Sequence, residues 1–152
     1  MGFTTPSLKG RALRLLSQRE HSRAELLRKL APHTEEGDDL YALLDDLQAR
    51  DFISETRVVE SVLNRRAGRM GAARIRQELQ SKGLGAETVQ QAVAQLQCSE
   101  LERARDVWRR KFGEPAADPQ ARAKQMRFLL ARGFSGDVVR RTVLGADESD
   151  GG

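Results

Sequence analysis

The sequence repeats one apolar pattern three times, at steps of 49 and 50 residues. The positions that coincide in the three copies are Leu30 with Leu79 and Leu129, Leu40 with Val89 and Val139, and Leu44 with Val93 and Val143. A glycine followed by a large apolar residue also recurs, at Gly83 and Gly133, and a polar stretch replaces it in the first copy. Self-similarity at a fixed period of this size marks a structural unit that is used several times. The sequence therefore predicts three tandem repeats of roughly 50 residues each.

Helix-forming patterns fill each copy. Apolar residues recur at the i, i+3, i+4 and i+7 positions of one helical face, for example from Leu40 to Leu47, and no segment shows the alternation typical of a strand. Serines that can cap a first helical turn precede several of these segments, at Ser7, Ser22, Ser54 and Ser135. Ser22 and Glu25 also have the spacing of a capping box. The chain is therefore predicted to be all-α, with three short helices in each of three tandem repeats.

These patterns divide the chain into five parts. They are an N-terminal extension (1–7), three-helix repeats at 8–52, 53–98 and 99–145, and a polar tail (146–152) that we expect to be disordered. Three short helices bury only a small core, so neighbouring repeats must stabilise one another and the chain should be elongated and curved. We expect Trp108 and Phe112 to lie in the core of the third repeat, and Cys98 to be partly buried and unreactive.

Residue types that carry catalysis or bind metals are scarce. The chain has two histidines and one cysteine, and no stretch has the spacing of a zinc site, a phosphate-binding loop or a nucleophile elbow. An acidic cluster between Glu35 and Asp46 lacks the calcium-loop pattern and is interpreted as solvated surface. We therefore expect no enzymatic activity, no catalytic residue, no metal and no cofactor.

The sequence carries no pattern of export or of membrane insertion. Its N-terminus lacks the apolar segment of a signal peptide, and no apolar run approaches the roughly 20 residues that span a bilayer. A single cysteine fits a reducing compartment. We expect a soluble cytoplasmic protein that does not contact membranes and is a monomer.

A three-helix unit with a glycine turn can be a DNA-binding fold in which the last helix reads the bases. The last helix of the first copy carries Asp45 and Asp46, which DNA phosphates would repel. That of the second copy carries glutamines and no cation, and only that of the third offers Arg140 and Arg141. Base-specific reading by all three repeats is therefore not expected.

Basic residues concentrate on the other helices instead, within a chain of net charge +4. Each one taken alone is interpreted as a solvated surface residue, and those that end a helix also complement its dipole. As a set they suggest contact with an acidic partner surface, DNA phosphates included. The expected partner-binding residues are Arg57, Arg65, Arg66, Arg69, Arg74, Arg76, Lys82, Arg109, Arg110, Lys111, Lys124, Arg127 and Arg132. We expect charge reversal at Arg74 and Arg76 to leave the fold intact.

Three segments carry a resemblance to a known family. They are ALRLLSQREHSRAELLRKL near the start, NRRAGRMGAARIRQELQSKGL in the middle and KQMRFLLARGFSGDVVRRTV near the end. The most specific motif is G-x-x-R-I-x-x-E-L, which begins at Gly71 and is followed by Lys82 and Gly83. The chain resembles the RecX regulatory family, bacterial modulators of the RecA recombinase. It departs from the family at the start of the fourth helix, where Ser54 and its neighbours replace a common Asp-Asp and Arg-Phe pattern, and at Met70, where an aromatic residue is often found.

The resemblance implies a fold of tandem three-helix repeats and a function that spacing alone does not reveal. RecX-like proteins bind RecA, lodge in the groove of its nucleoprotein filament, and inhibit its ATPase, strand-exchange and co-protease activities, which modulates recombination, DNA repair and the SOS response. The partner-binding residues would then face RecA or the DNA of the RecA filament, and weak binding to DNA alone is compatible with this role. The alternative is a stand-alone helical DNA-binding protein.

Overall fold

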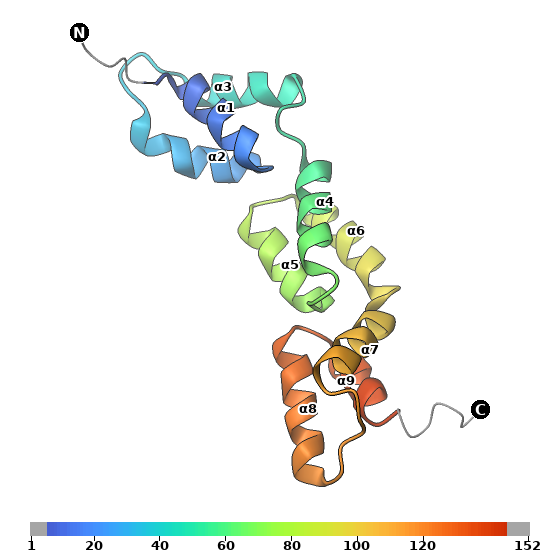
Figure 1. Cartoon of the computed structure of the whole chain (residues 1–152). Helices are drawn as coiled ribbons and strands as arrows, with labels where there is room; N and C mark the ends of the chain where they lie inside the picture. Colours follow the sequence, from blue (N-terminus) through green and yellow to red (C-terminus); the bar gives the residue numbers. More distant parts are fainter. Residues whose placement is uncertain (1–5, 146–152) are drawn as a thin grey trace.

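The computed structural model describes residues 6–145, and within that range it contains nine α-helices, one short 3₁₀ turn and no strand (Figure 1). The first repeat holds α1 (Leu8–Gln18), α2 (Arg23–Leu30), the 3₁₀ turn η1 (Ala31–His33) and α3 (Leu40–Ala49). The second holds α4 (Glu55–Arg66), α5 (Ala72–Ser81) and α6 (Ala86–Gln97). The third holds α7 (Glu100–Lys111), α8 (Pro119–Ala131) and α9 (Gly136–Val143). The predicted all-α class is confirmed, while the tail that was expected to be disordered lies outside the described residues.

Side-chain caps begin most of these helices. The serines predicted to cap helices accept a backbone N–H from the first turn in each case, and Ser22 and Glu25 form both halves of the capping box. Two further caps, Asp39 before α3 and Asp118 before α8, were not identified from the sequence. A side-chain cap satisfies a backbone donor that the helix itself leaves unpaired, so these residues fix where each helix starts.

Glutamates from neighbouring helices cap the two helices that are preceded by an N-cap glycine. Gly71 and Gly85 precede α5 and α6 and have no side chain that could accept a hydrogen bond. Glu100 of α7, which is buried, accepts the backbone N–H of Ala72 at 3.0 Å. Glu55 of α4 accepts the N–H of Gly85 at 3.1 Å. The starts of α5 and α6 therefore depend on tertiary contacts.

Each repeat encloses its own small apolar core. The three leucines that coincide in the sequence, Leu30, Leu79 and Leu129, are all 1% exposed or less. Trp108 is buried in the core of the third repeat, as predicted, and its indole N–H donates to Gln125 at 2.9 Å. The expectation that Cys98 is partly buried is wrong: this residue directly follows α6 and is exposed.

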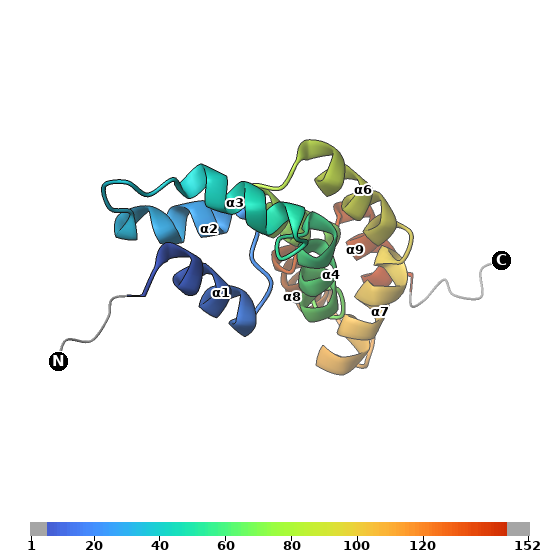
Figure 2. The same ribbon diagram turned by 90° about the horizontal axis from the view of Figure 1, so that it is seen from above.

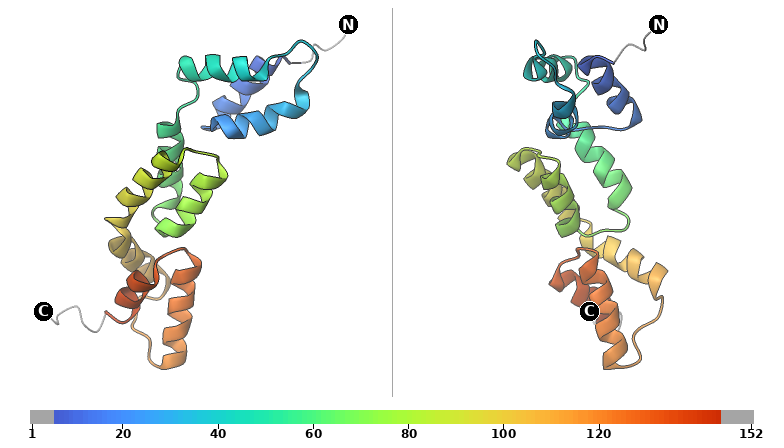
Figure 3. Two further views of the ribbon diagram at one scale, coloured as in Figure 1. Left: turned by 180° about the vertical axis from the view of Figure 1, so that it is seen from behind. Right: turned by 90° about the vertical axis from the view of Figure 1, so that its left-hand side faces the viewer.

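The three repeats follow one another along an elongated and curved chain, with the first repeat at one end and the third at the other (Figure 1). The same order is visible from behind and from the side (Figure 3), and the view from above shows the first repeat displaced sideways from the other two (Figure 2). The second helices α2, α5 and α8 form what we call the second-helix row, because the end of each one contacts the start of the preceding one.

Backbone groups join α8 to α5 in this row. The N–H of Gly71 donates to the carbonyl of Arg132 at 2.8 Å, and the N–H of Ala73 donates to that of Gly133 at 3.2 Å. The guanidinium of Arg74 donates to Ala131 at 2.8 Å. Unpaired donors at the start of one helix thus meet unpaired acceptors at the end of another, and the two helix dipoles attract each other.

The end of α5 meets the start of α2 in the same manner. The hydroxyl of Ser22 donates to the carbonyl of Lys82 at 2.5 Å, and Arg28 donates to that of Ser81 at 3.3 Å. Gly83, with φ of 71°, packs so closely that a Cβ atom there would lie 2.6 Å from Ala24 Cβ. Both junctions therefore need a glycine in the left-handed conformation at the end of the later helix.

Candidate partner-binding surface

The second-helix row is rich in basic residues. Within their bounds α2, α5 and α8 carry eight basic and two acidic residues, whereas the third helices α3, α6 and α9 carry two basic and four acidic residues. The two acidic residues of the row, Glu25 and Glu78, are both held by cations of the chain itself. The row therefore presents an excess of positive charge to the surroundings.

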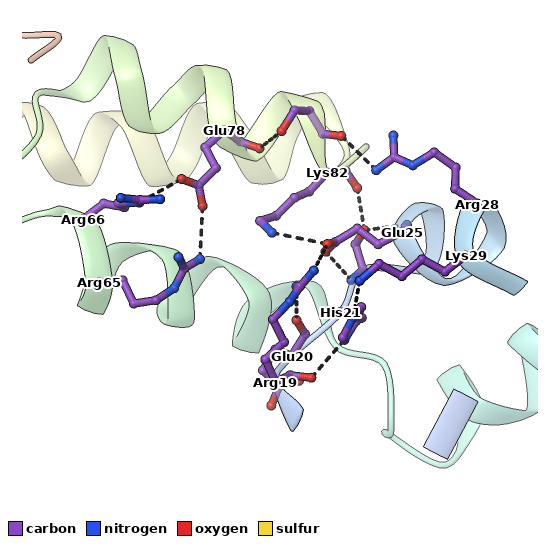
Figure 4. A network of polar contacts seen from close by, with 12 residues as sticks. Arg19, Glu20, His21, Glu25, Arg28, Lys29, Arg65, Arg66, Glu78 and Lys82 are labelled. Atoms are coloured by element: carbon purple, nitrogen blue, oxygen red, sulfur yellow. Dashed lines mark hydrogen bonds and ion pairs between the residues drawn. The ribbon is translucent and has the colours of Figure 1, made fainter. Parts of the chain in front are cut away.

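Glu25 lies at the centre of the junction between the first and second repeats (Figure 4). Its carboxylate contacts Arg19 at 2.7 Å and Lys82 of α5 at 3.4 Å, and it accepts the N–H of Ser22 at 3.0 Å. Burial raises the pKa of this carboxyl group, but the hydrogen bonds from Arg19 and Ser22 and the charge of Lys82 outweigh burial and bring the pKa to about 2. Glu25 is therefore ionised at neutral pH and ties the two repeats together.

His21 is buried beside the same junction (Figure 4). The Nζ atom of Lys29 lies 3.0 Å from Nε2, and the carbonyl oxygen of Arg19 lies 3.0 Å from Nδ1. An ammonium group only donates, so Nε2 accepts and the ring proton sits on Nδ1, from which it is donated to Arg19. Burial lowers the pKa of His21, and the nearby positive charges of Arg19 and Lys29 lower it further. This histidine is a neutral structural residue and not a metal ligand in a cluster.

Two predicted partner-binding residues, Arg57 and Lys82, hold this junction. Arg57 contacts Glu20 and Asp51, both at 3.0 Å, and the contact with Glu20 raises the pKa of its guanidinium. The side chain of Lys82 is only 12% exposed, because it reaches toward Glu25. Both residues therefore have a role within the fold, which the sequence did not indicate.

Arg65 and Arg66 converge on one carboxylate. Glu78 of α5 accepts from Arg65 through one oxygen and from Arg66 through the other, each at 3.1 Å (Figure 4). The two arginine side chains are 48% and 38% exposed, so the group lies on the surface. An exposed ion pair of this kind contributes little to stability, and the arginines stay accessible to a partner.

The junction between the second and third repeats also uses basic residues. Arg74 packs against Gly133, since a Cβ atom at position 133 would lie 2.7 Å from the backbone nitrogen of Arg74. Arg110 donates to the carbonyl of Gly68 at 2.6 Å. Arg74 is thus a junction residue, and the expectation that its replacement leaves the fold intact no longer follows.

Arg103 fastens the same junction, although the sequence suggested only a surface role for it. Its guanidinium donates to the carbonyls of Ala67, Met70 and Leu96 at 2.6–3.0 Å. These carbonyls lie after α4 and at the end of α6, where helices leave acceptors unpaired. Burial lowers the pKa of Arg103. No local pattern marks this contact with the second repeat, because the acceptors at Ala67 and Met70 lie 36 and 33 residues away in the sequence.

The remaining predicted residues have looser surroundings. Lys111 and Arg132 lie over the ring of Phe128, at 5.3 and 4.9 Å from its centre. Arg109 pairs with Asp106 of its own helix, and Arg69 donates to the carbonyl of Arg65. Among the predicted residues, the exposed side chains that form no hydrogen bond, ion pair or cation–π contact within residues 6–145 are Arg76, Lys124 and Arg127.

The described part of the chain offers no metal site and no membrane span. Residues 6–145 contain no group of three or more histidine, cysteine, aspartate or glutamate side chains that could hold a metal ion. No helix in this range is long and apolar enough to cross a bilayer. Three small cores, two polar junctions and a basic second-helix row together define a helical-repeat protein.

Comparison with known proteins identifies the family. Residues 54–93 match the family pattern described as "RecX, second three-helix domain", and residues 99–143 match "RecX, third three-helix domain". The chain is 60% identical over 141 residues to Regulatory protein RecX of Leptothrix cholodnii, covering 93% of this chain and 90% of that protein. It is 57% identical over 141 residues to Regulatory protein RecX of Ralstonia nicotianae, covering 93% and 89%. The chain belongs to the RecX regulatory protein family, as the resemblance of its motifs predicted.

Two solved structures share the fold. The crystal structure of RecX from Lactobacillus salivarius superposes with a TM-score of 0.77 at 20% identity, covering 93% of this chain and 95% of that one. A second crystal structure of regulatory protein RecX gives a TM-score of 0.72 at 21% identity, covering 91% and 71%. The fold of three tandem three-helix repeats is therefore shared by proteins whose sequences have diverged widely.

Proposed function

We propose that this chain binds RecA and its nucleoprotein filament and inhibits the ATPase, strand-exchange and co-protease activities of RecA. The observation that carries the proposal is the basic second-helix row of a protein that belongs to a family of regulators. A RecA filament on DNA is a polyanion with a repeating protein surface, and an elongated chain of three similar repeats is suited to follow such a repeat. The repeats act as the binding units, with boundaries at 8–52, 53–98 and 99–145.

The inhibition requires no chemistry by this chain. Three weak contacts that are joined in one molecule give a higher overall affinity than any one of them, because the second and third bind at high effective concentration. A chain that bridges adjacent RecA subunits in this way restrains the movements that accompany ATP hydrolysis. The basic residues of the second and third repeats face acidic RecA surface or the bound DNA.

The titration of DNA-dependent ATP hydrolysis by RecA tests this function. We expect substoichiometric amounts of the chain to inhibit hydrolysis, while binding to DNA without RecA stays weak. Hydrolysis that is unchanged at equimolar protein contradicts the proposal. Tight binding to DNA alone, falling steeply with salt, would instead support the stand-alone DNA-binding protein.

A pair of matched variants tests the second-helix row itself. One variant combines Arg76→Gln, Lys124→Gln and Arg127→Gln, which removes three charges from exposed side chains of the row. The control combines Gln90→Glu, Gln91→Glu and Gln95→Glu on the exposed face of α6, which changes the net charge by the same amount. We expect the first variant to lose inhibition and the control to retain it. Equal loss in both would show that net charge matters and the row does not.

A further inference from the structure

A hollow of about 230 Å³ opens between α4 and α5 of the second repeat. Its walls include Arg66 and Met70 from the end of α4 and the segment after it. The rest comes from α5, through Arg74, Gln77 and Glu78 among others. It lies on the second-helix row and beside the Arg65–Arg66–Glu78 group of Figure 4.

The hollow combines an apolar floor with unused hydrogen-bond donors. Met70 is half-buried and Ile75 is buried beneath the opening, so the floor is a flexible thioether next to an aliphatic side chain. Arg66 uses only Nε to reach Glu78, and its two terminal nitrogens form no hydrogen bond within residues 6–145. A guanidinium with free terminal nitrogens matches the two oxygens of a carboxylate.

The charge around the hollow is positive. Arg65, Arg66, Arg69 and Arg74 lie in or beside it. The carboxylate of Glu78, which faces them, has both oxygens occupied by Arg65 and Arg66. An incoming negative charge therefore meets an excess of cations. Binding of an apolar side chain on the apolar floor is also favourable, because it removes apolar surface from water.

We propose that this hollow is a docking site for an extended or helical segment of a partner protein that inserts one apolar side chain next to a carboxylate. The inserted side chain packs on Met70, and the neighbouring carboxylate accepts from the terminal nitrogens of Arg66. A nucleic-acid backbone fits less well, because it carries a charge at every nucleotide and has no group that matches the floor. The α6 helix of the same repeat also has no basic residue that could continue a phosphate track.

This proposal rests on the proposed function, in which the partner is the RecA filament. Deeply seated anchor residues dominate the binding energy of most interfaces, so blocking the hollow should have a large effect. Gln77→Trp places a large side chain at the wall of the hollow, on an exposed position of α5. Gln80→Trp is the matched control, since Gln80 is exposed on the same helix but does not line the hollow.

The experiment measures binding of the wild-type chain and both variants to RecA filaments assembled on single-stranded DNA, by biolayer interferometry. We expect Gln77→Trp to weaken binding at least about tenfold and Gln80→Trp to change it less than about twofold. Helical circular dichroism and thermal melting of both variants should match the wild type, which separates a blocked site from a damaged fold.

The outcomes separate the two proposals. If the wild-type chain does not bind filaments, the proposed function fails and the docking site fails with it. If the wild-type chain binds and Gln77→Trp binds equally well, or if both variants weaken binding alike, only the docking site is overturned. Binding to bare single-stranded DNA is the last arm, and an equal loss there in Gln77→Trp would assign the hollow to nucleic acid and overturn the protein-docking proposal.

Discussion

The junction between the second and third repeats depends on one position that has no side chain, and Gly133→Ala tests that dependence. Gly133 has φ of 93°, and a Cβ atom there would lie 2.7 Å from the backbone nitrogen of Arg74 and would also overlap the side chain of Arg74. Backbone cannot yield to such a contact, so the substituted chain must move α8 away from α5. That movement disrupts the hydrogen bonds from Gly71, Ala73 and Arg74 to the end of α8.

Gly37 provides a matched control for the magnitude. It has φ of 92°, almost the same as Gly133, and a Cβ atom at Gly37 would meet nothing within 4 Å. Gly37→Ala therefore measures the backbone strain alone, about 1–2 kcal/mol for alanine in the left-handed region. Each hydrogen bond at the junction contributes about 0.5–1.5 kcal/mol. With three of them disturbed, Gly133→Ala should cost roughly 2–4 kcal/mol more than Gly37→Ala.

Urea denaturation followed by two signals measures this difference. Circular dichroism reports all the helices, and the fluorescence of Trp108, the single tryptophan, reports the core of the third repeat. We expect the fluorescence transition of Gly133→Ala to move to lower urea and to separate from the circular dichroism transition, because the third repeat loses its neighbour. Equal costs for Gly133→Ala and Gly37→Ala, with coincident transitions, would refute the reasoning.

Two further predictions concern burial of charged groups. Acidification should weaken the first junction in two steps. The contribution of neutral His21 to the free energy of unfolding is complete above its ordinary pKa of 6.5 and falls below that pH. The contribution of ionised Glu25, roughly 3 kcal/mol, is complete above pH 4.5 and falls toward pH 2. Urea midpoints measured from pH 7.5 to 3 check this, and in Glu25→Gln the lower step should be absent. Glu100→Ala removes the acceptor for the N–H of Ala72 and should cost about 1–2 kcal/mol, measured by thermal melting, whereas Glu102→Ala on the exposed face of α7 should cost less than about 0.5 kcal/mol.

Local signals in the sequence predicted the helices and their repetition. The recurrence of Leu30, Leu79 and Leu129 at steps of 49 and 50 residues identified buried positions, because each repeat buries the equivalent residue of its second helix. Serine caps such as Ser22 were also predictable, since a cap and its target lie three residues apart. Val93 coincides with two buried residues in the repeat pattern, yet it is only partly buried, because the second repeat packs it at the margin of its core.

The contacts between repeats could not be predicted in this way. Ser22 and Lys82 are sixty residues apart, and no residue near Ser22 in the sequence indicates that its hydroxyl donates to the carbonyl of Lys82. The same limit applies to the candidate site. The basic character of the surface was predictable from residue types. Whether Arg57 or Arg76 forms an ion pair within the chain depends on carboxylates that only the fold brings close. Those two residues appear equivalent in the sequence and differ in the structure.

The matching ends of the second helices have a consequence for the length of such a chain. The starts of α2 and α5 each accept the glycine-ended helix that follows, so an extra repeat placed between the second and third would find compatible ends on both sides. The end of α2 lacks this fit, because it continues into a 3₁₀ turn that contains Pro32 in place of a glycine. The architecture can thus be lengthened from within, between repeats whose helix ends already match.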